Sequence, residues 1–164
     1  MFLNKKTALF IALAVFFAGL DRFLKMLALN FFEEAQHNLI GGIFKFSLAK
    51  NEYIAFSLPF GGPFLLYFTG FLIGLLIVYW LILNEKSEYG LAACLTFVIF
   101  GAISNMLDRI KFGYVIDYLD LKYFTVFNVA DIMIVGGVFI YLILNKKDEN
   151  NANLVCFCFG KFKK

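Results

Sequence analysis

Residues 127–144 read FNVADIMIVGGVFIYLIL, a long apolar segment with two polar residues near its start. Asn128 and Asp131 are three residues apart, so they share one face if the segment is helical. A carboxylate at the head of a membrane span is costly unless it is paired or used in function. The segment therefore predicts a membrane-spanning helix with a functional site at its beginning.

The composition places the whole chain in lipid. Of its 164 residues, 62% are hydrophobic and 20% are aromatic, more apolar surface than a soluble domain of this length can bury. About 20 helical residues cover a hydrocarbon core about 30 Å thick. Four stretches reach that length: Thr7 to Leu27, Phe64 to Leu83, Tyr89 to Leu107 and Val126 to Leu144. We expect an all-α membrane protein with four transmembrane helices in residues 1–145, followed by a basic cytoplasmic tail, 146–164, that is disordered or lies on the lipid surface.

Basic residues indicate how the helices are oriented. Lysines occur before the first predicted span, in the turn after the second and after the fourth, at Lys5, Lys6, Lys86, Lys146 and Lys147. The positive-inside rule then places both termini in the cytoplasm and the loops 30–63 and 109–125 outside. The first span has no convincing signal-peptide cleavage site, so we expect it to remain uncleaved. The net charge of only +3, without a basic stripe carrying interleaved aromatics, does not support nucleic-acid binding.

The first outer loop has the pattern of β-structure. Apolar and polar residues alternate over Ile43 to Leu48, and a second stretch, Tyr53 to Leu58, follows a predicted turn near Lys50 to Glu52. Alternation with a period of two is typical of half-buried strands. We therefore expect a small extracytoplasmic β-cradle between the first and second helices.

Polar residues gather at the outer ends of the predicted spans. At about 1.5 Å per residue, Asp21 lies roughly 21 Å along the first helix from Thr7, near its outer end. The other polar residues expected at this end are Lys25, Asn105, Asp108, Arg109, Asn128 and Asp131, with Asp117 in the second outer loop. Spacings of three or four residues direct each group to one helix face, which predicts a shared polar pocket at the headgroup level of the outer leaflet.

Each group also has a purely structural interpretation. Asp21 and Lys25 form an i,i+4 pair that is able to end a span as an interfacial ion pair. Asn105 and its charged neighbours are compatible with a helix end whose long side chains reach the interface. Asp131 is compatible with an interhelical hydrogen bond or with a carboxylate that the helix macrodipole stabilises. Convergence of all these residues on one pocket favours the functional interpretation.

Carboxylates are the chemistry that this pocket offers. The chain has a single histidine, His37, no HExxH motif and no serine nucleophile elbow, so we expect no metal and no cofactor. Two aspartates that share one proton are able to activate water and polarise an amide carbonyl. Asp117 and Asp131 are the candidates, and Asp108 and Asp21 are competitors that spacing alone does not exclude.

Five blocks carry a resemblance to a known family. They are Asp21-x-x-x-Lys25, the segment 51–57 (NEYIAFS), the segment 101–109 (GAISNMLDR), the segment 113–118 (GYVIDY) and the segment 127–131 (FNVAD). In this order on a four-span chain, the blocks resemble the lipoprotein signal peptidases, or signal peptidase II. The resemblance implies an aspartic endopeptidase of the bacterial inner membrane, with its active site near the outer face. It would cleave diacylglyceryl-modified prolipoproteins just before the lipidated cysteine. We expect a monomer in contact with membrane lipids.

The resemblance also implies roles for individual residues. Asp117 and Asp131 would be the catalytic pair. Substrate binding or support of the pair would fall to Asn51, Asn105, Arg109, Asn128, Asp21, Lys25 and Asp108. The chain departs from the family pattern at Tyr53 and Ser104, where glycine is common.

A second class of function remains as an alternative. A small membrane transport or assembly subunit would use its carboxylates to relay protons. Such a protein is expected to distribute acidic residues through the membrane, often in inverted repeats. Here they crowd one end of the spans and no internal repeat is visible.

Overall fold

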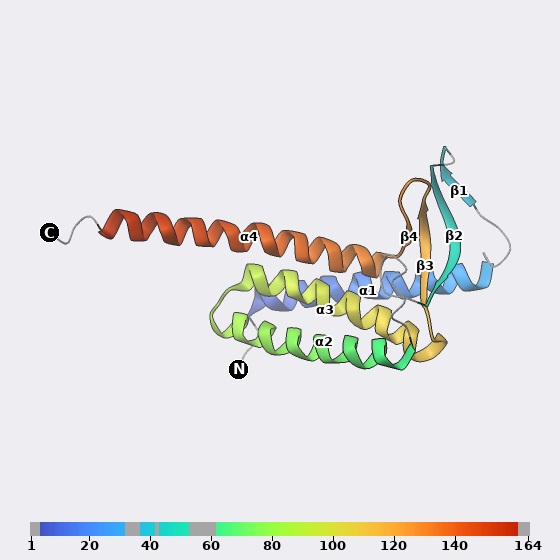
Figure 1. Cartoon of the computed structure of the whole chain (residues 1–164), viewed down its shortest axis with the longest axis horizontal. Coiled ribbons are helices and arrows are strands. Elements are labelled where there is room, and N and C mark those ends of the chain that lie inside the picture. The colour runs from blue at the N-terminus through green and yellow to red at the C-terminus, as the bar shows by residue number, and fades with distance from the viewer. Residues whose placement is uncertain (1–3, 32–36, 42, 53–61, 161–164) are drawn as a thin grey trace.

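Four long helices and a small sheet make up the described part of the chain (Figure 1). The computed structural model describes residues 4–31, 37–41, 43–52 and 62–160, with the backbone alone for 147–160. The helices are α1 (Lys5–Phe31), α2 (Gly62–Glu85), α3 (Tyr89–Phe112) and α4 (Val129–Gly160). The first three contain the predicted spans, the fourth overlaps its predicted span from Val129 onward, and each is long and apolar enough to cross a membrane. The predicted four-helix membrane architecture is therefore confirmed.

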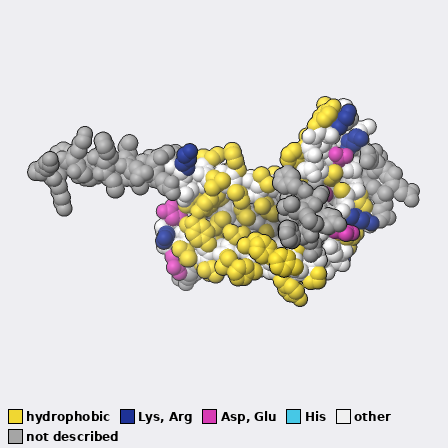
Figure 2. Space-filling view, in the orientation of Figure 1, with side chains coloured by type: hydrophobic (Ala, Val, Ile, Leu, Met, Phe, Trp, Pro, Cys, Tyr) yellow, Lys and Arg dark blue, Asp and Glu magenta, His cyan; other side chains and the backbone are white. Residues whose placement is uncertain are grey.

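The outer surface of the bundle suits lipid. Figure 2 shows hydrophobic side chains over the middle of the bundle and charged ones toward its two ends. Phe64, Tyr67 and Phe71 on α2 are exposed, as are Val135 and Phe139 on α4. A helical backbone satisfies its own hydrogen bonds, so helices with such apolar and aromatic outer surfaces are suited to hydrocarbon.

Helix α3 lies at the centre of the bundle and contacts α1, α2 and α4. It approaches α4 closely because of two glycines. A Cβ atom on Gly101 would lie 2.6 Å from the Ala130 carbonyl oxygen, and one on Gly137 would lie 2.8 Å from the Cys94 carbonyl oxygen. Small residues at such a crossing let two helix backbones pack together in a membrane. The close crossing brings the polar end of α3 against the beginning of α4.

The sheet at one end of the bundle has four antiparallel strands in the order β1-β2-β3-β4. They are β1 (His37–Ile40), β2 (Phe44–Asn51), β3 (Val115–Leu121) and β4 (Val126–Phe127). The predicted cradle is confirmed in β2, and the second loop adds β3 and β4. The other predicted strand, Tyr53 to Leu58, lies outside the described residues. The predicted turn near Lys50 is wrong, because Lys50 and Asn51 continue β2 and pair with Ile116 and Val115.

The ends of the last two helices differ from their predicted positions. Gly113 ends α3 with a positive φ of 82°, and its N–H donates to the Arg109 carbonyl oxygen. Glycine adopts this conformation without steric cost, and the turn leads the chain directly into β3. Helix α4 begins at Val129 rather than Val126, because residues 126 and 127 pair with β3.

Helix α4 also continues as backbone through Gly160, past the predicted boundary at residue 145 (Figure 1). The segment 145–159 contains neither proline nor glycine and is rich in residues compatible with a helix. The backbone of α4 therefore extends past residue 145, and the position of the tail on the lipid surface stays a prediction.

Candidate functional site

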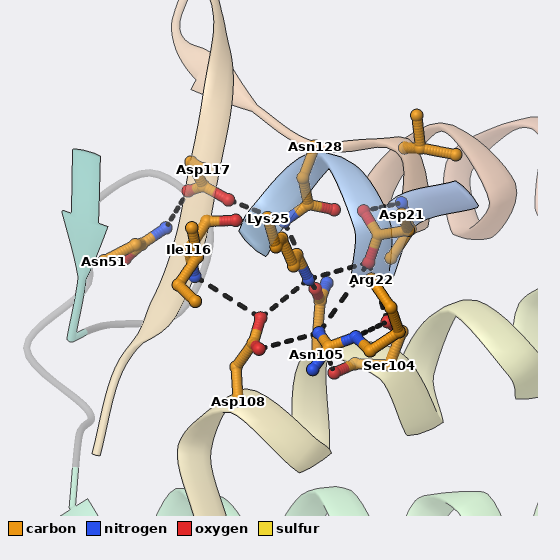
Figure 3. A network of polar contacts seen from close by, with 12 residues as sticks. Asp21, Arg22, Lys25, Asn51, Ser104, Asn105, Asp108, Ile116, Asp117 and Asn128 are labelled. Atoms are coloured by element: carbon orange, nitrogen blue, oxygen red, sulfur yellow. Dashed lines mark hydrogen bonds and ion pairs between the residues drawn. The ribbon is translucent and has the colours of Figure 1, made fainter. Parts of the chain in front are cut away.

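Polar side chains from α1, α3, α4 and the sheet meet where the sheet joins the bundle (Figure 3). Asp21, Asp108 and Asn128 have no exposed surface, and Lys25 and Asp117 are each 2% exposed. The structure thus brings the dispersed polar residues into one region. Their positions along the predicted helices had led to the same expectation. Buried charges are tolerated only when they are paired and hydrogen-bonded, so we consider each residue's partners in turn.

Lys25 is the centre of the buried part. Its Nζ lies 2.9 Å from Asp21 Oδ2, 2.7 Å from Asp108 Oδ2 and 2.8 Å from Asn105 Oδ1. A lysine ammonium has three N–H donors, and these three acceptors use all of them. The predicted i,i+4 pair of Asp21 and Lys25 is present within α1, and the contacts of Lys25 with Asp108 and Asn105 join α1 to α3.

Arg22 and Ser104 extend this cluster and were not predicted. Arg22 donates to Asp108 Oδ1 at 2.6 Å, to the Ser104 carbonyl oxygen at 2.9 Å and, through Nε, to Ser104 Oγ at 3.1 Å. Ser104 in turn donates to Asp21 Oδ2 at 2.6 Å. Two cations, Arg22 and Lys25, therefore balance two anions, Asp21 and Asp108. The hydroxyl of Ser104, where glycine is common in the family pattern, is part of the network.

Asp131 is held by the first turn of its own helix. Asn128 caps α4: its Oδ1 accepts from the Asp131 backbone N–H at 2.9 Å, and its own N–H donates to Asp131 Oδ2 at 3.1 Å. This reciprocal arrangement is a capping box, in which two otherwise unsatisfied donors are paired. Asn105 donates from Nδ2 to the other oxygen of Asp131 at 2.8 Å. Both carboxylate oxygens of Asp131 are thus fixed in place.

Asp117 receives hydrogen bonds from two amides. Asn128 Nδ2 donates to Oδ1 at 2.6 Å, and Asn51 Nδ2 donates to Oδ2 at 3.1 Å. Asn51 is opposite Val115, so it is a diagonal cross-strand neighbour of Asp117 and shares its face of the sheet. Burial, and then the negative charge of Asp131, raise the pKa of Asp117 to about 7. Near neutral pH this carboxyl is therefore able to hold a proton.

The four acidic candidates now separate into two kinds. Asp21 and Asp108 are ion-paired with Lys25 and fully buried. Asp117 and Asp131 accept from amides, and both are connected to Asn128. The geometry therefore favours Asp117 and Asp131 as the reactive pair over the two competitors.

One side of the site is open. Asn51, Arg109 and Asp131 are partly exposed, whereas Asn105 is buried with Asn128. Arg109 lies one residue after Asp108, and the charges of Asp131, Asp117 and Asp108 act on its guanidinium. Among the described residues no group of three or more His, Cys, Asp or Glu side chains is arranged to hold a metal ion.

Three polar residues of the site were missed: Arg22, Ser104 and Tyr118. Arg22 follows Asp21 directly and Tyr118 follows Asp117 directly, so both lay inside the quoted blocks without an assigned role. Their contacts depend on how α1 and α3 are rotated and on which face of β3 meets the bundle. Sequence spacing does not specify either.

Comparisons with known proteins agree on one family. Residues 12–145 match the family model described as signal peptidase (SPase) II. A lipoprotein signal peptidase of Enterococcus faecalis is 34% identical over 151 residues, covering 88% of this chain and 94% of that protein. One from Caldicellulosiruptor bescii is 35% identical, covering 79% and 87%. One from Syntrophus aciditrophicus is 33% identical, covering 92% and 100%.

Two solved structures share the fold. Both are described as bacterial membrane enzymes. The first aligns with a TM-score of 0.77 at 22% identity and covers 88% of this chain and 91% of that one. The second aligns with a TM-score of 0.72 at 21% identity and covers 86% and 94%. The helices and the sheet therefore form an arrangement that occurs in known membrane enzymes.

Proposed function

The chain belongs to the signal peptidase II family, and we propose that it removes the signal peptide of diacylglyceryl-modified prolipoproteins with Asp117 and Asp131 as an aspartic dyad. It is a multi-pass bacterial membrane protein and a peptidase. Family membership does not favour the transport or assembly alternative.

The observation that carries the catalytic assignment is the double role of Asn128. Its side-chain amide donates to Asp117, and its backbone N–H donates to Asp131. One buried residue therefore holds a carboxyl from the sheet beside a carboxyl from α4. Two neighbouring carboxyls split their pKa values and share one proton, which is the state that an aspartic peptidase needs.

The surroundings of the two aspartates indicate which one acts as the general base and which one carries the shared proton. Asp131 lies in the first turn of α4, where the helix macrodipole favours a negative charge, so it serves as the ionised general base. Asp117, with its raised pKa, carries the shared proton. Asp131 removes a proton from water while the water oxygen attacks the scissile carbonyl carbon, and Asp117 protonates the carbonyl oxygen. The C–N bond then breaks as the departing nitrogen takes the proton from Asp131 and one hydroxyl of the intermediate returns its proton to Asp117, which leaves a carboxylic acid and restores the dyad.

The supporting residues fall into two groups by exposure. Asn105 and Asn128 are buried, so they hold the dyad rather than contact substrate. Asn51 and Arg109 are partly exposed beside the dyad and are placed to bind the substrate backbone. The site is stabilised on its buried side by the ion pairs of Lys25 with Asp21 and Asp108.

The position of the site fits a lipid-anchored substrate. The dyad lies at the junction of the sheet and the helix ends, one end of the apolar band in Figure 2. A cysteine carrying a diacylglyceryl group holds the adjacent peptide bond at headgroup depth. We propose that the sheet end faces the outer side of the membrane, that both termini are cytoplasmic, and that the enzyme acts as a monomer.

Cleavage of matched peptides tests this function. The purified protein in detergent or lipid should cut a diacylglyceryl-modified lipobox peptide and leave the same unlipidated peptide essentially intact. A chelator should not change the rate. Equal cleavage of both peptides would refute the substrate assignment, and activity lost to a chelator and restored by zinc would refute the aspartic mechanism.

A further inference from the structure

The first turn of α4 is tied to three parts of the protein. A helix leaves its first backbone N–H groups without intrahelical partners. Here the Val129 N–H donates to the Tyr118 hydroxyl at 3.1 Å, and the Ala130 N–H donates to Asp21 Oδ1 at 3.2 Å. The Asp131 N–H donates to the Asn128 cap. The partners come from β3, α1 and the cap itself, so this helix end is fixed by tertiary contacts.

Tyr118 makes two of its contacts through one oxygen atom. Its hydroxyl accepts from the Val129 N–H and donates to Asp21 Oδ1 at 3.0 Å. The side chain has no exposed surface, and its ring packs against Phe46 with centroids 5.3 Å apart. Burial and the charge of Asp21 raise the pKa of Tyr118 well above its usual range, so the hydroxyl remains a proton donor. A buried side chain of this kind acts on other residues and not on substrate.

The two ends of this contact lie next to the two proposed catalytic aspartates. Tyr118 directly follows Asp117 on β3, and Val129 is two residues before Asp131 on α4. We propose that the Tyr118 hydroxyl is a tether that sets the spacing between the strand carrying Asp117 and the helix carrying Asp131. Tyr118 is thus a positioning residue of the dyad. This inference rests on the proposed function.

If Tyr118 sets the spacing of the dyad, its loss should change the pH dependence of turnover. A side chain that only stabilises the fold would not have this effect. Without the hydroxyl, Asn128 still connects Asp117 to α4, so the dyad loosens while the fold persists. Weaker repulsion between the two carboxyls lowers the pH at which the pair loses its shared proton. The other charges that act on the dyad are Lys25 and Asp21 on α1 and Arg109 on α3. Asp21 loses its bond to the Tyr118 hydroxyl but keeps its contacts with Lys25 and Ser104, so these charges remain in place.

Tyr118→Phe tests the tether while keeping the ring. We expect kcat to fall about tenfold, the effect of losing the buried hydrogen bond to the Val129 N–H, with KM changed less than about twofold. The basic limb of the pH–rate profile should move about half a unit toward lower pH. Tyr141→Phe is the matched control, because that hydroxyl bonds to Tyr79 on the outer surface of the bundle. It should leave kcat and the pH profile unchanged.

Val129→Pro removes the other end of the same hydrogen bond. Proline is well tolerated at the first position of a helix, and it leaves no unpaired N–H there. The Tyr118–Asp21 contact is retained, yet the kcat loss and the pH shift should match those of Tyr118→Phe. Tyr118→Phe loses the hydroxyl's bonds to both Val129 and Asp21, whereas Val129→Pro loses only the bond to Val129. Because the bond to Val129 is shared, the double variant should be little worse than Tyr118→Phe alone. A normal pH profile in Tyr118→Phe, or full activity in Val129→Pro, would overturn the tether.

Amide hydrogen exchange separates a failure of the tether from a failure of the proposed function. If the wild type cleaves no lipidated peptide, the proposed function is wrong. Exchange at the start of α4 still reports the contact, and it should be faster in Tyr118→Phe but not in Tyr141→Phe. Unchanged exchange in Tyr118→Phe would overturn the tether whatever the activity.

Discussion

Individual residues at this site are distinguished by their partners rather than by their type. Four aspartates meet within one network, yet two are neutralised by Lys25 and two accept hydrogen bonds from amides. The cations paired with Asp21 and Asp108 offset part of the cost of burying these carboxyls. Asp117 instead has a pKa of about 7 because burial and the charge of Asp131 both disfavour its ionised form. The environment therefore selects which acids are able to take part in proton transfer.

The raised pKa of Asp117 predicts a pH-dependent cost to stability. The folded state holds this proton up to about pH 7, whereas an unfolded aspartate releases it near pH 3.8. The favourable contribution of the protonated group is therefore present below about pH 4 and is lost as the pH rises to about 7. Asp117→Asn should remove this loss, so its Tm relative to wild type should increase from about pH 4 to about pH 7. The amide introduced at position 117 would face the side-chain amide of Asn51, which donates to this position in the wild type. Asn51 is partly exposed, so its side chain has room to turn away.

Thermal unfolding in detergent at several pH values measures the effect. A constant Tm difference between the two proteins across this range would contradict the assignment of the raised pKa to Asp117.

Among the elements, the α3–α4 pair determines how well the site is assembled. Asn105 reaches Asp131 across this interface, four residues after Gly101 on the same face of α3. The two helices come close because Gly101 and Gly137 present no side chain to the opposite backbone. The close packing of α3 and α4 thus allows Asn105 to hold the carboxyl group of Asp131 at the start of α4.

Adjacent glycines offer a matched test of this packing. A Cβ on Gly137 would lie 2.7 Å from Val98 Cγ2, whereas one on Gly136 would have nothing within 4 Å. Gly137→Ala should cost about 1–3 kcal/mol through overpacking and lower turnover, and Gly101→Ala should do the same. Gly136→Ala should be neutral or slightly stabilising, because alanine is the better helix former. The comparison needs unfolding curves and turnover rates, and equal effects at 136 and 137 would contradict it.

At the scale of the whole molecule, the placement of the site depends on the orientation of the bundle. Lys122 lies beyond β3 at the sheet end, and Ser87 lies in the turn between α2 and α3 at the other end. A cysteine introduced at Lys122 should react with a membrane-impermeant reagent in intact cells, and one at Ser87 should not. The positive-inside rule supplies the reason. The reverse labelling pattern would place the dyad on the wrong side for lipidated preproteins.

The sequence predicted the parts of this architecture that depend on local pattern and depth. Apolar length identified the four helices, and counting along them brought Asp21, Asn105 and Asn128 to one end. The pairing of β3 with β2 was missed because those strands are more than 60 residues apart and no strand was predicted in the second loop. The contacts of Arg22 with Ser104 and of Tyr118 with Val129 were missed because helix rotation and sheet facing decide them.

Turnover of a lipidated peptide by the dyad variants tests the central claim most directly. Asp117→Asn and Asp131→Asn should each reduce kcat about a hundredfold or more while the protein remains folded, because an amide neither shares the proton nor deprotonates water. The double variant should be little worse than either, since the pair acts as one unit. Asp120→Asn, on the same strand as Asp117, is the control and should remain close to wild type. Near-normal turnover in Asp117→Asn, with loss of turnover in Asp108→Asn instead, would contradict the assigned dyad.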